Sequence, residues 1–477
     1  MSRIIVILLI FSVIDASAQT DLLTVYLEMG ARNNPGVMAA FHNYEAALER
    51  VPQAGALEDP QFDAGFFLKP MEIIDGQQIA QFELMQMFNW FGTRKAAKTE
   101  AQHMAQMAFE QFREARDDLF LRIYEQWYVL NRLQQRLMNN RENTELLRQL
   151  ETLALRRFSA GGSPGTRVMP PVETATLSTP SSSSMNMADM SRKPDNTATN
   201  TGGMSMSASS GTSGGMSEAL RIRLEIAEME NNEESILSEI EAEKARFNAL
   251  LNKPATSEIV IPDTFPKTQY IFDIKDITSL VFEQNPMLGM YHEETLVYEA
   301  KEEMNRKMGY PMLGIGLQYM LIGSKAVASD MTDMSGSTGG MNGRDMLMPM
   351  VSVSIPLYRG KYSAAMKEAR FQRRAAQAKY DDTRNLLEAE LYRLKHELDD
   401  AERKITLYHK QTELARTTYD LLVREFISGN EGLSEILQVQ RQLLDYKLKT
   451  SEATADFNTG VARVQKFISN LGTREEF

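Results

Sequence analysis

Two kinds of hydrophobic pattern alternate along this chain. Residues 93–160 and 361–428 contain neither proline nor glycine, and their apolar residues recur at steps of three and four. This spacing places one apolar stripe along a helix, and each run of 68 residues extends roughly 100 Å when helical. The first stripe consists of Phe112, Ala115, Leu119, Ile123, Trp127, Leu130, Leu133 and Leu137. The pattern predicts two very long helices with coiled-coil packing.

A strict alternation of apolar with small or polar residues precedes each long helix. It predicts strands at about 60–69, 78–89, 310–322 and 348–358. Period two over ~10 residues is typical of outer-membrane strands. Trp90 and Tyr358 mark the change from strand to helix, where they suit either an interfacial aromatic belt or plain packing. Four spanning strands cannot close alone, and an open edge in lipid leaves backbone groups unpaired. The pattern therefore predicts an oligomer that shares one barrel.

The chain is internally duplicated. Pro35 and Pro60 recur as Pro286 and Pro311, each 251 positions later. Gly92 and Gly161 recur 268 positions later, as Gly360 and Gly429. Matches in order at fixed offsets indicate two copies of one unit. We expect a first structural repeat over 19–252 and a second over 253–477.

Each repeat carries one methionine-rich insertion. After the Gly161 and Gly429 pair, Met216-Ser217-Glu218 matches Leu433-Ser434-Glu435, but the first repeat has 51 extra residues before the match. This insertion is expected at about 163–217. In the second repeat, the offset between matching residues grows from 251 at Pro311 to 268 at Gly360. The extra residues predict a methionine-rich loop at about 323–347. Return helices are expected at about 218–252 and 433–471, which makes two long helical hairpins.

Composition excludes several classes of protein. The net charge of −12 leaves no basic stripe for nucleic acid. The chain has no cysteine, and its five histidines are scattered outside any catalytic motif, so we expect no enzyme and no resident cofactor. Residues 1–18 read as a secretory signal peptide, with Arg3 before an apolar run and Ala16-Ser17-Ala18 at the cleavage site. No later stretch predicts a transmembrane helix.

This arrangement resembles the TolC outer-membrane efflux family over essentially the whole mature chain. The resemblance rests on the duplicated Asn-Pro pairs, on Gly92 and Gly360, and on the segments 157–161 and 425–429, which read RFSAG and EFISG. It implies a mainly α fold with a membrane β portion, in which a trimer shares a twelve-stranded β-barrel continuous with a long periplasmic coiled-coil tunnel. The segment MQMFNWFGTRK at 85–95 is most similar to the heavy-metal, copper- and silver-exporting branch.

The resemblance also implies a location and partners. The chain would lie in the outer membrane of a Gram-negative bacterium, contact its lipid, and extend into the periplasm. It would dock to a periplasmic adaptor (membrane-fusion) protein and, with it, to an inner-membrane pump of the RND type. The docking tips would be Phe158, Gly161, Phe426 and Gly429.

A ring of acidic residues constricts the entrance in this family. Glu435 occupies the first such position here, Gln438 stands where a second acid is common, and Glu218 is the match in the first repeat. These residues would form the gate. An ordinary solvated helix position is the alternative reading of Glu435.

The methionines of the two insertions predict contact with a soft metal ion. Thioether sulfur suits Cu(I) and Ag(I), and a Ser/Gly background keeps the chain flexible. The candidate ligands are Met185, Met187, Met190, Met204, Met206, Met216, Met331, Met334, Met341, Met346 and Met348. They place thioethers at the entrance and at the exit of one duct, with Cu(I) or Ag(I) as transient cargo. The alternatives are low-complexity spacers in a duct for organic drugs or polypeptides, and a secreted coiled-coil structural protein.

Overall fold

The structure is a computed structural model that describes residues 22–73, 76–161, 214–270, 273–324, 343–428 and 432–471. The expected signal peptide and most of both methionine-rich segments lie outside these ranges. The chain divides into two compact units, which are described separately. Unit 1 comprises Met1–Leu137, Ile236–Thr412 and Asp445–Phe477, and unit 2 comprises Met138–Ser235 and Glu413–Leu444.

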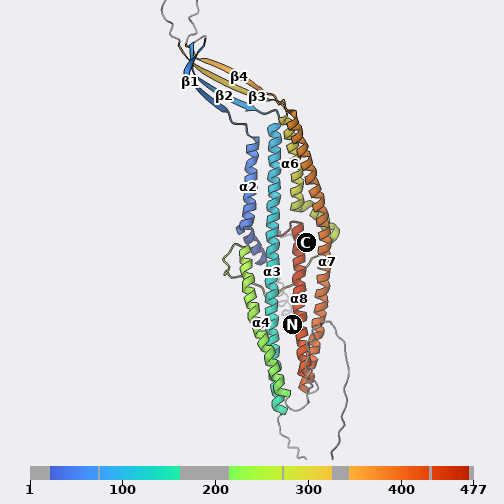
Figure 1. Ribbon diagram of the computed structural model, residues 1–477. Coiled ribbons are helices and arrows are strands. Elements are labelled where there is room, and N and C mark those ends of the chain that lie inside the picture. Colours follow the sequence, from blue (N-terminus) through green and yellow to red (C-terminus); the bar gives the residue numbers. More distant parts are fainter. Residues whose placement is uncertain are drawn as a thin grey trace, which may run out of the picture. The chain divides into compact units, whose positions relative to one another are not determined.

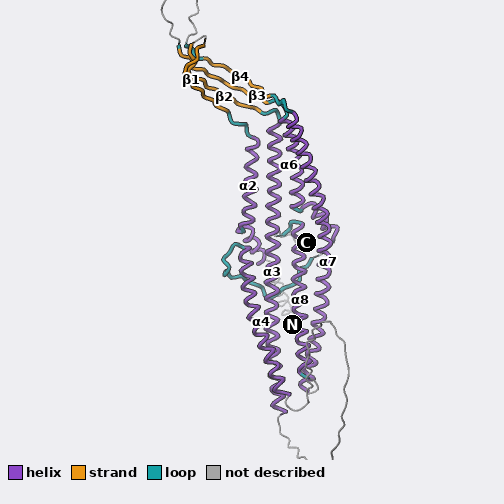
Figure 2. The backbone as a smooth tube through the Cα atoms, viewed as in Figure 1, coloured by secondary structure: helices purple, strands orange, loops and turns teal. Residues whose placement is uncertain are grey.

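Long helices and one four-stranded sheet make up the described chain (Figures 1 and 2). In order, the elements are α2 (Pro35–Gly55), β1 (Gln61–Ile73), β2 (Gly76–Phe88), α3 (Thr93–Gly161), α4 (Gly214–Leu250), α5 (Ile274–Gln284), α6 (Pro286–Met308), β3 (Met312–Gly323), β4 (Met346–Ser354), α7 (Arg359–Ser428) and α8 (Leu433–Phe467). The prediction of a mainly α fold with a β portion is confirmed. The two long helices, α3 and α7, begin within two residues of the expected positions.

Several boundaries differ from the expected ones. The strand β4 lies at 346–354 rather than 348–358, and α8 ends at Phe467 rather than near residue 471. The sequence patterns also did not predict the helices α2, α5 and α6. Both α2 and α6 begin at the proline of an Asn-Pro pair, where the fixed φ of proline suits the first helical position.

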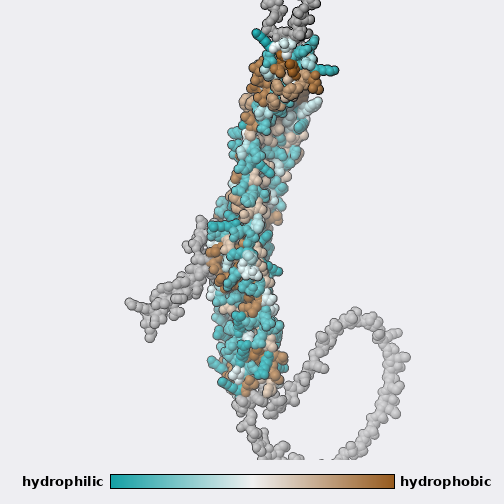
Figure 3. Space-filling view, turned by 90° about the vertical axis from the view of Figure 1, so that its left-hand side faces the viewer, coloured by the Kyte–Doolittle hydropathy of each residue, from teal (hydrophilic) through white to brown (hydrophobic). Residues whose placement is uncertain are grey.

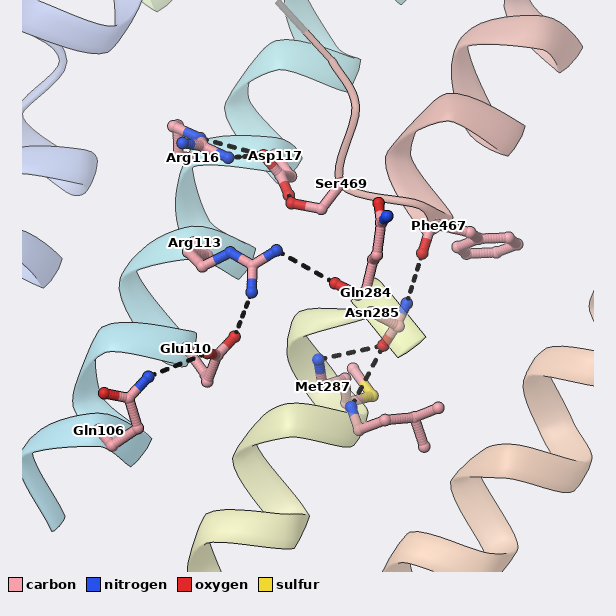
Figure 4. Close-up of polar contacts among 11 residues, drawn as sticks. Gln106, Glu110, Arg113, Arg116, Asp117, Gln284, Asn285, Met287, Phe467 and Ser469 are labelled. Carbon is pink, nitrogen blue, oxygen red and sulfur yellow. Dashed lines mark hydrogen bonds and ion pairs between the residues drawn. The ribbon is translucent and has the colours of Figure 1, made fainter. Parts of the chain in front are cut away.

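The two Asn-Pro pairs make the same contacts in both repeats. The side chain of Asn34 accepts hydrogen bonds from the first backbone N–H groups of α2, and Asn285 does the same for α6. Each asparagine also donates through Nδ2 to the end of a return helix, at 3.0 Å to Leu250 O and at 3.1 Å to Phe467 O. Figure 4 shows the second of these contacts. The matched caps confirm the internal duplication.

A partly buried polar cluster joins α3 to the end of α5 and the start of α6 within unit 1 (Figure 4). Arg113 pairs with Glu110 at 2.8 Å and donates to Gln284 O at 3.1 Å. Burial raises the pKa of Glu110, and the nearby Arg113 guanidinium opposes that rise. A Cβ atom on Gly289 would lie 3.0 Å from the Glu110 carboxyl carbon, so glycine permits this close approach. The cluster fixes the position of the second repeat against the first.

Unit 1 contains separate clusters of buried side chains, and the one around α3 also includes Ala455 and Ala462 of α8. Trp127 of α3 packs against the rings of Tyr26 and Phe247, with centroids 5.7 and 6.0 Å away. In the second repeat, Leu394 of α7 and Val464 of α8 belong to a separate cluster of buried side chains. The apolar stripe predicted on the first long helix is therefore a core stripe.

The four strands form one antiparallel sheet in the order β1-β2-β3-β4. The ladder between β2 and β3 joins the first repeat to the second, pairing Phe88 with Leu313 at one end and Gln77 with Gly323 at the other. The outer strands, β1 and β4, each have one partner strand in the described chain. Two free edges remain.

The strand-to-helix junctions differ between the repeats. Gly92 has a φ of +83°, which favours glycine, whereas its match Gly360 lies inside α7 with open space around it. Trp90 stacks on Tyr310 with ring centroids 5.4 Å apart, and Tyr358 is 86% exposed. The two aromatic residues at these junctions thus have different surroundings within one chain.

Candidate functional site

One face of the sheet in unit 1 is apolar and exposed. The register aligns Phe62, Leu84, Leu317 and Pro349 in one row across all four strands. Leu317 is 46% exposed and Val351 is 78% exposed. Figure 3 shows hydrophobic side chains gathered over the strands. An apolar patch of this extent marks a surface that contacts protein or membrane rather than water.

The opposite face of the sheet, called the polar face below, carries acidic, amide, serine, glycine and methionine residues. Its rows include Asp63, Glu83, Gln318 and Met348, side by side on the four strands. Along β3 the burial alternates, so that Gly314, Gly316 and Gln318 are buried while the apolar residues between them are exposed. The sheet thus exposes the side that a soluble protein would bury.

Unit 2 contains the ends of the two helical hairpins. A cluster of buried side chains joins all four helices there, from Leu150 of α3 and Ile222 of α4 to Phe426 of α7 and Ile436 of α8. This core holds the hairpins together near the sites of the expected gate.

Polar contacts in unit 2 connect the first hairpin to the second. Gln440 Nε2 donates to Asn143 Oδ1 at 3.0 Å, and Arg441 forms an ion pair with Glu225. Both contacts border a cavity of about 300 Å³. Sequence reasoning missed them, because neither hairpin alone shows which residue of the other it will meet.

The expected gate residues lie on α4 and α8. Glu435 and Gln438 are exposed on α8, and Glu218 is half-buried on α4. Arg221 donates to Ser434 Oγ at 3.1 Å, which brings the starts of the two helices together one turn from Glu218. An acidic residue in the first turn, such as Glu435, also interacts favourably with the helix dipole.

The expected docking tips lie at the ends of α3 and α7. Phe426 is 1% exposed and packs inside the unit 2 core. The apolar periodicity of α7 accounts for this burial, and a docking role for Phe426 stays a prediction. Phe158 and Gly161 lie in the last turn of α3, and Gly429 lies outside the described residues.

Three of the predicted methionine ligands fall within the described chain. Met216 is 50% exposed in the first turn of α4. Met346, which was expected in a loop, and Met348 are residues of the strand β4, paired with Met320 and Gln318. The remaining candidates, outside the described residues, are Met185, Met187, Met190, Met204, Met206, Met331, Met334 and Met341.

Sequence reasoning missed Met85 and Met87 of β2. Their side chains lie over Gly314 and Gly316 of the neighbouring strand, on the polar face of the sheet. The available signal was their alternation with Gln86, which places both on one face of a strand. Histidine, aspartate and glutamate side chains of the described ranges form no group of three that suits a metal ion.

Comparison with known proteins identifies the fold, and part of the chain matches one family model. Residues 282–469 match the family described as outer membrane efflux protein. No curated protein matches the chain. None of the helices in the described ranges combines the length and hydrophobicity of a membrane span.

Solved structures of outer-membrane proteins and transmembrane channels share the fold over nearly the whole chain. VceC from Vibrio cholerae has a TM-score of 0.63 at 14% identity, covering 94% of this chain and 96% of its own. CusC has a TM-score of 0.65 at 11% identity, with 94% and 92% covered. The channel MtrE of Neisseria gonorrhoeae has 0.63 at 10%, with 95% and 90% covered. Residues 282–469 are therefore similar in sequence to outer membrane efflux proteins, and nearly the whole chain has the fold of these solved structures.

Proposed function

We propose that this protein is the outer-membrane exit duct of a tripartite efflux system and that it exports Cu(I) or Ag(I). The main support for a duct is the four-stranded sheet, which has an exposed apolar face and two free edges. A secreted coiled-coil protein would have no use for such a sheet. The fold shared with outer-membrane channels supports the same assignment.

The free edges favour a closed assembly of several copies. Unpaired backbone groups cost several kcal/mol each in lipid, so β4 of one copy would pair with β1 of the next. Three copies of this sheet give twelve strands, with the apolar face toward lipid and the polar face toward the lumen. The long helices would continue the duct into the periplasm, where an adaptor and an RND-type inner-membrane pump complete the system.

A ring of carboxylates would constrict the periplasmic entrance. In a threefold assembly the three copies of Glu435 approach one another, hold cations and narrow the path. We expect Glu435→Ala to reduce the cation selectivity of the purified protein in planar lipid bilayers and to change its single-channel conductance. Glu388→Ala, which removes an exposed carboxylate of α7, is the matched control. If the bilayers show no conductance, the duct is refuted. Conductance and selectivity identical in both variants would leave Glu435 an ordinary surface residue.

The entrance methionines would capture the metal cargo. We expect a variant with leucine at Met185, Met187, Met190, Met204, Met206 and Met216 to lose silver and copper tolerance in cells, because leucine keeps size and apolarity but removes the sulfur. Zinc tolerance should persist, since thioethers discriminate against harder ions. The exit set, Met331, Met334, Met341, Met346 and Met348, should matter less. Full metal tolerance in a strain that lacks the protein, combined with lost tolerance to organic compounds, would instead identify a duct for organic drugs.

A further inference from the structure

The sheet sorts its methionines by face. In the regularly paired ranges 80–88, 312–321 and 346–354, every methionine lies on the polar face. These residues are Met85, Met87, Met312, Met320, Met346, Met348 and Met350. The apolar face of the same ranges is made largely of leucine, isoleucine, valine, phenylalanine and tyrosine. Methionine that served only as an apolar filler would be expected on the apolar face as well.

Two of these sulfurs converge on one point. They belong to Met87 and Met85 and lie 2.6 and 3.3 Å from the position that a Cβ atom would take on Gly314, so they are within about 6 Å of each other. A bond between zinc and a cysteine sulfur is about 2.3 Å long, and an ion with bonds of similar length to two sulfurs holds them roughly 4 to 5 Å apart. Rotation about the flexible methionine side chain is enough to close this difference.

A third thioether, that of Met350, lies on the other side of Gly316 from Met85. The register places Met85, Gly316 and Met350 in one row on three adjacent strands. The Met85 sulfur is 3.0 Å from the Cβ position of Gly316, so it lies over the strand that separates the two methionines. Because Gly316 has no side chain, nothing on β3 stands between Met85 and Met350 in this row.

The charges on this face favour a cation. Asp63 and Glu83 are neighbours on β1 and β2, one row from Met85. The paired ranges 61–66, 80–88, 312–321 and 346–354 contain no lysine, arginine, histidine or cysteine. Carboxylates nearby attract any cation, but the converging donors are thioethers alone, which select a soft monovalent ion over zinc or magnesium.

We propose that Met85, Met87 and Met350 form a thioether site for Cu(I) or Ag(I) on the polar face of the sheet. The site rests on the proposed function, because the duct would place this face along the lumen. It gives the exported ion a holding point at the level of the membrane, separate from the methionines of both insertions.

Silver binding to the purified full-length protein tests this site. The background carries leucine at the six entrance methionines, so that their sulfurs do not compete. We compare M85L/M87L/M350L with the matched control M38L/M104L, whose methionines are exposed on α2 and α3. The triple variant should lose about one Ag(I) per chain, or weaken it at least tenfold, as changes around bound metals do. The control should bind as the background does.

Two further measurements separate the site from a packing role. In methionine methyl NMR, Ag(I) should shift the signals assigned through M85L, M87L and M350L. Gly316→Ala keeps all three sulfurs but displaces Met85, so it should also weaken binding about tenfold. Equal silver binding in the triple variant and the control, or unshifted methyl signals, would overturn the proposal. Circular dichroism and mass measurement establish that each variant is folded and assembled.

The outcome for the site is distinguishable from the outcome for the function. Silver bound at the sheet, with full silver tolerance in cells that lack the protein, would uphold the site and refute the metal cargo. Tolerance that depends on the protein, without silver at the sheet, would uphold the cargo and refute the site.

Discussion

Replacing Leu317 with arginine is expected to abolish assembly in the outer membrane. Leu317 lies mid-strand on the apolar face, between Leu84 and Pro349 in the register. An arginine on the lipid face costs about 2–4 kcal/mol near the bilayer midplane, and every copy in a shared barrel incurs this cost. The measurement is the amount of protein in the outer-membrane fraction and its assembled mass in detergent.

Gln81→Arg is the matched control for this change. It adds the same charge to the neighbouring strand, on the polar face of the sheet. An arginine there would face a water-filled lumen, so assembly should be close to that of the unmodified protein. If both variants assemble equally well, the apolar face does not contact lipid, and the proposed orientation of the sheet is wrong.

Truncating Trp127 is expected to lower the free energy of unfolding by about 3–5 kcal/mol. The side chain is 1% exposed and lies in a core that joins residues from the N-terminal helical segment, α3 and α4. Trp127→Ala leaves a cavity at the point where Tyr26 and Phe247 meet it. Thermal unfolding in detergent, monitored by far-ultraviolet circular dichroism, measures the decrease in the free energy of unfolding.

The chain offers its own control for this experiment. It has two tryptophans, and Trp90, which stacks on Tyr310, is only half-buried. Trp90→Ala should therefore destabilise less, and it leaves Trp127 as the single reporter of core fluorescence. A larger loss from Trp90→Ala than from Trp127→Ala would contradict the core assignment.

The elements of this fold that depend on local pattern could be predicted from the sequence. Runs without proline or glycine predicted α3 and α7, and the alternation of apolar and polar residues predicted the strands. Both patterns arise from residues that are close together in the sequence. Helix α2 was missed although Asn34-Pro35 marked its start, since Pro52 lies inside it and obscures the helical pattern.

The elements that depend on tertiary pairing could not be predicted. The alignment of β2 with β3 joins residues more than 200 positions apart, and it alone brings Met85 over Gly316. The burial of Phe426 likewise depends on helices from both repeats. The pair Glu225 and Arg441 is another example, since each residue by itself reads as a solvated charge.

The matched Asn34 and Asn285 caps have a consequence for symmetry. In an assembly of three copies, a feature present in both repeats occurs six times around the axis, and a feature of one repeat occurs three times. The asparagine caps are present in both repeats and would therefore occur six times. We call such features the sixfold set and those of one repeat the threefold set. Gln61 pairs with Met85, and its counterpart Met312, 251 positions later, pairs with Ser354. Ser354 therefore takes the place of Met85 in the second repeat, so the thioether site belongs to the threefold set. A duct of this kind would hold three soft ions at the sheet rather than six.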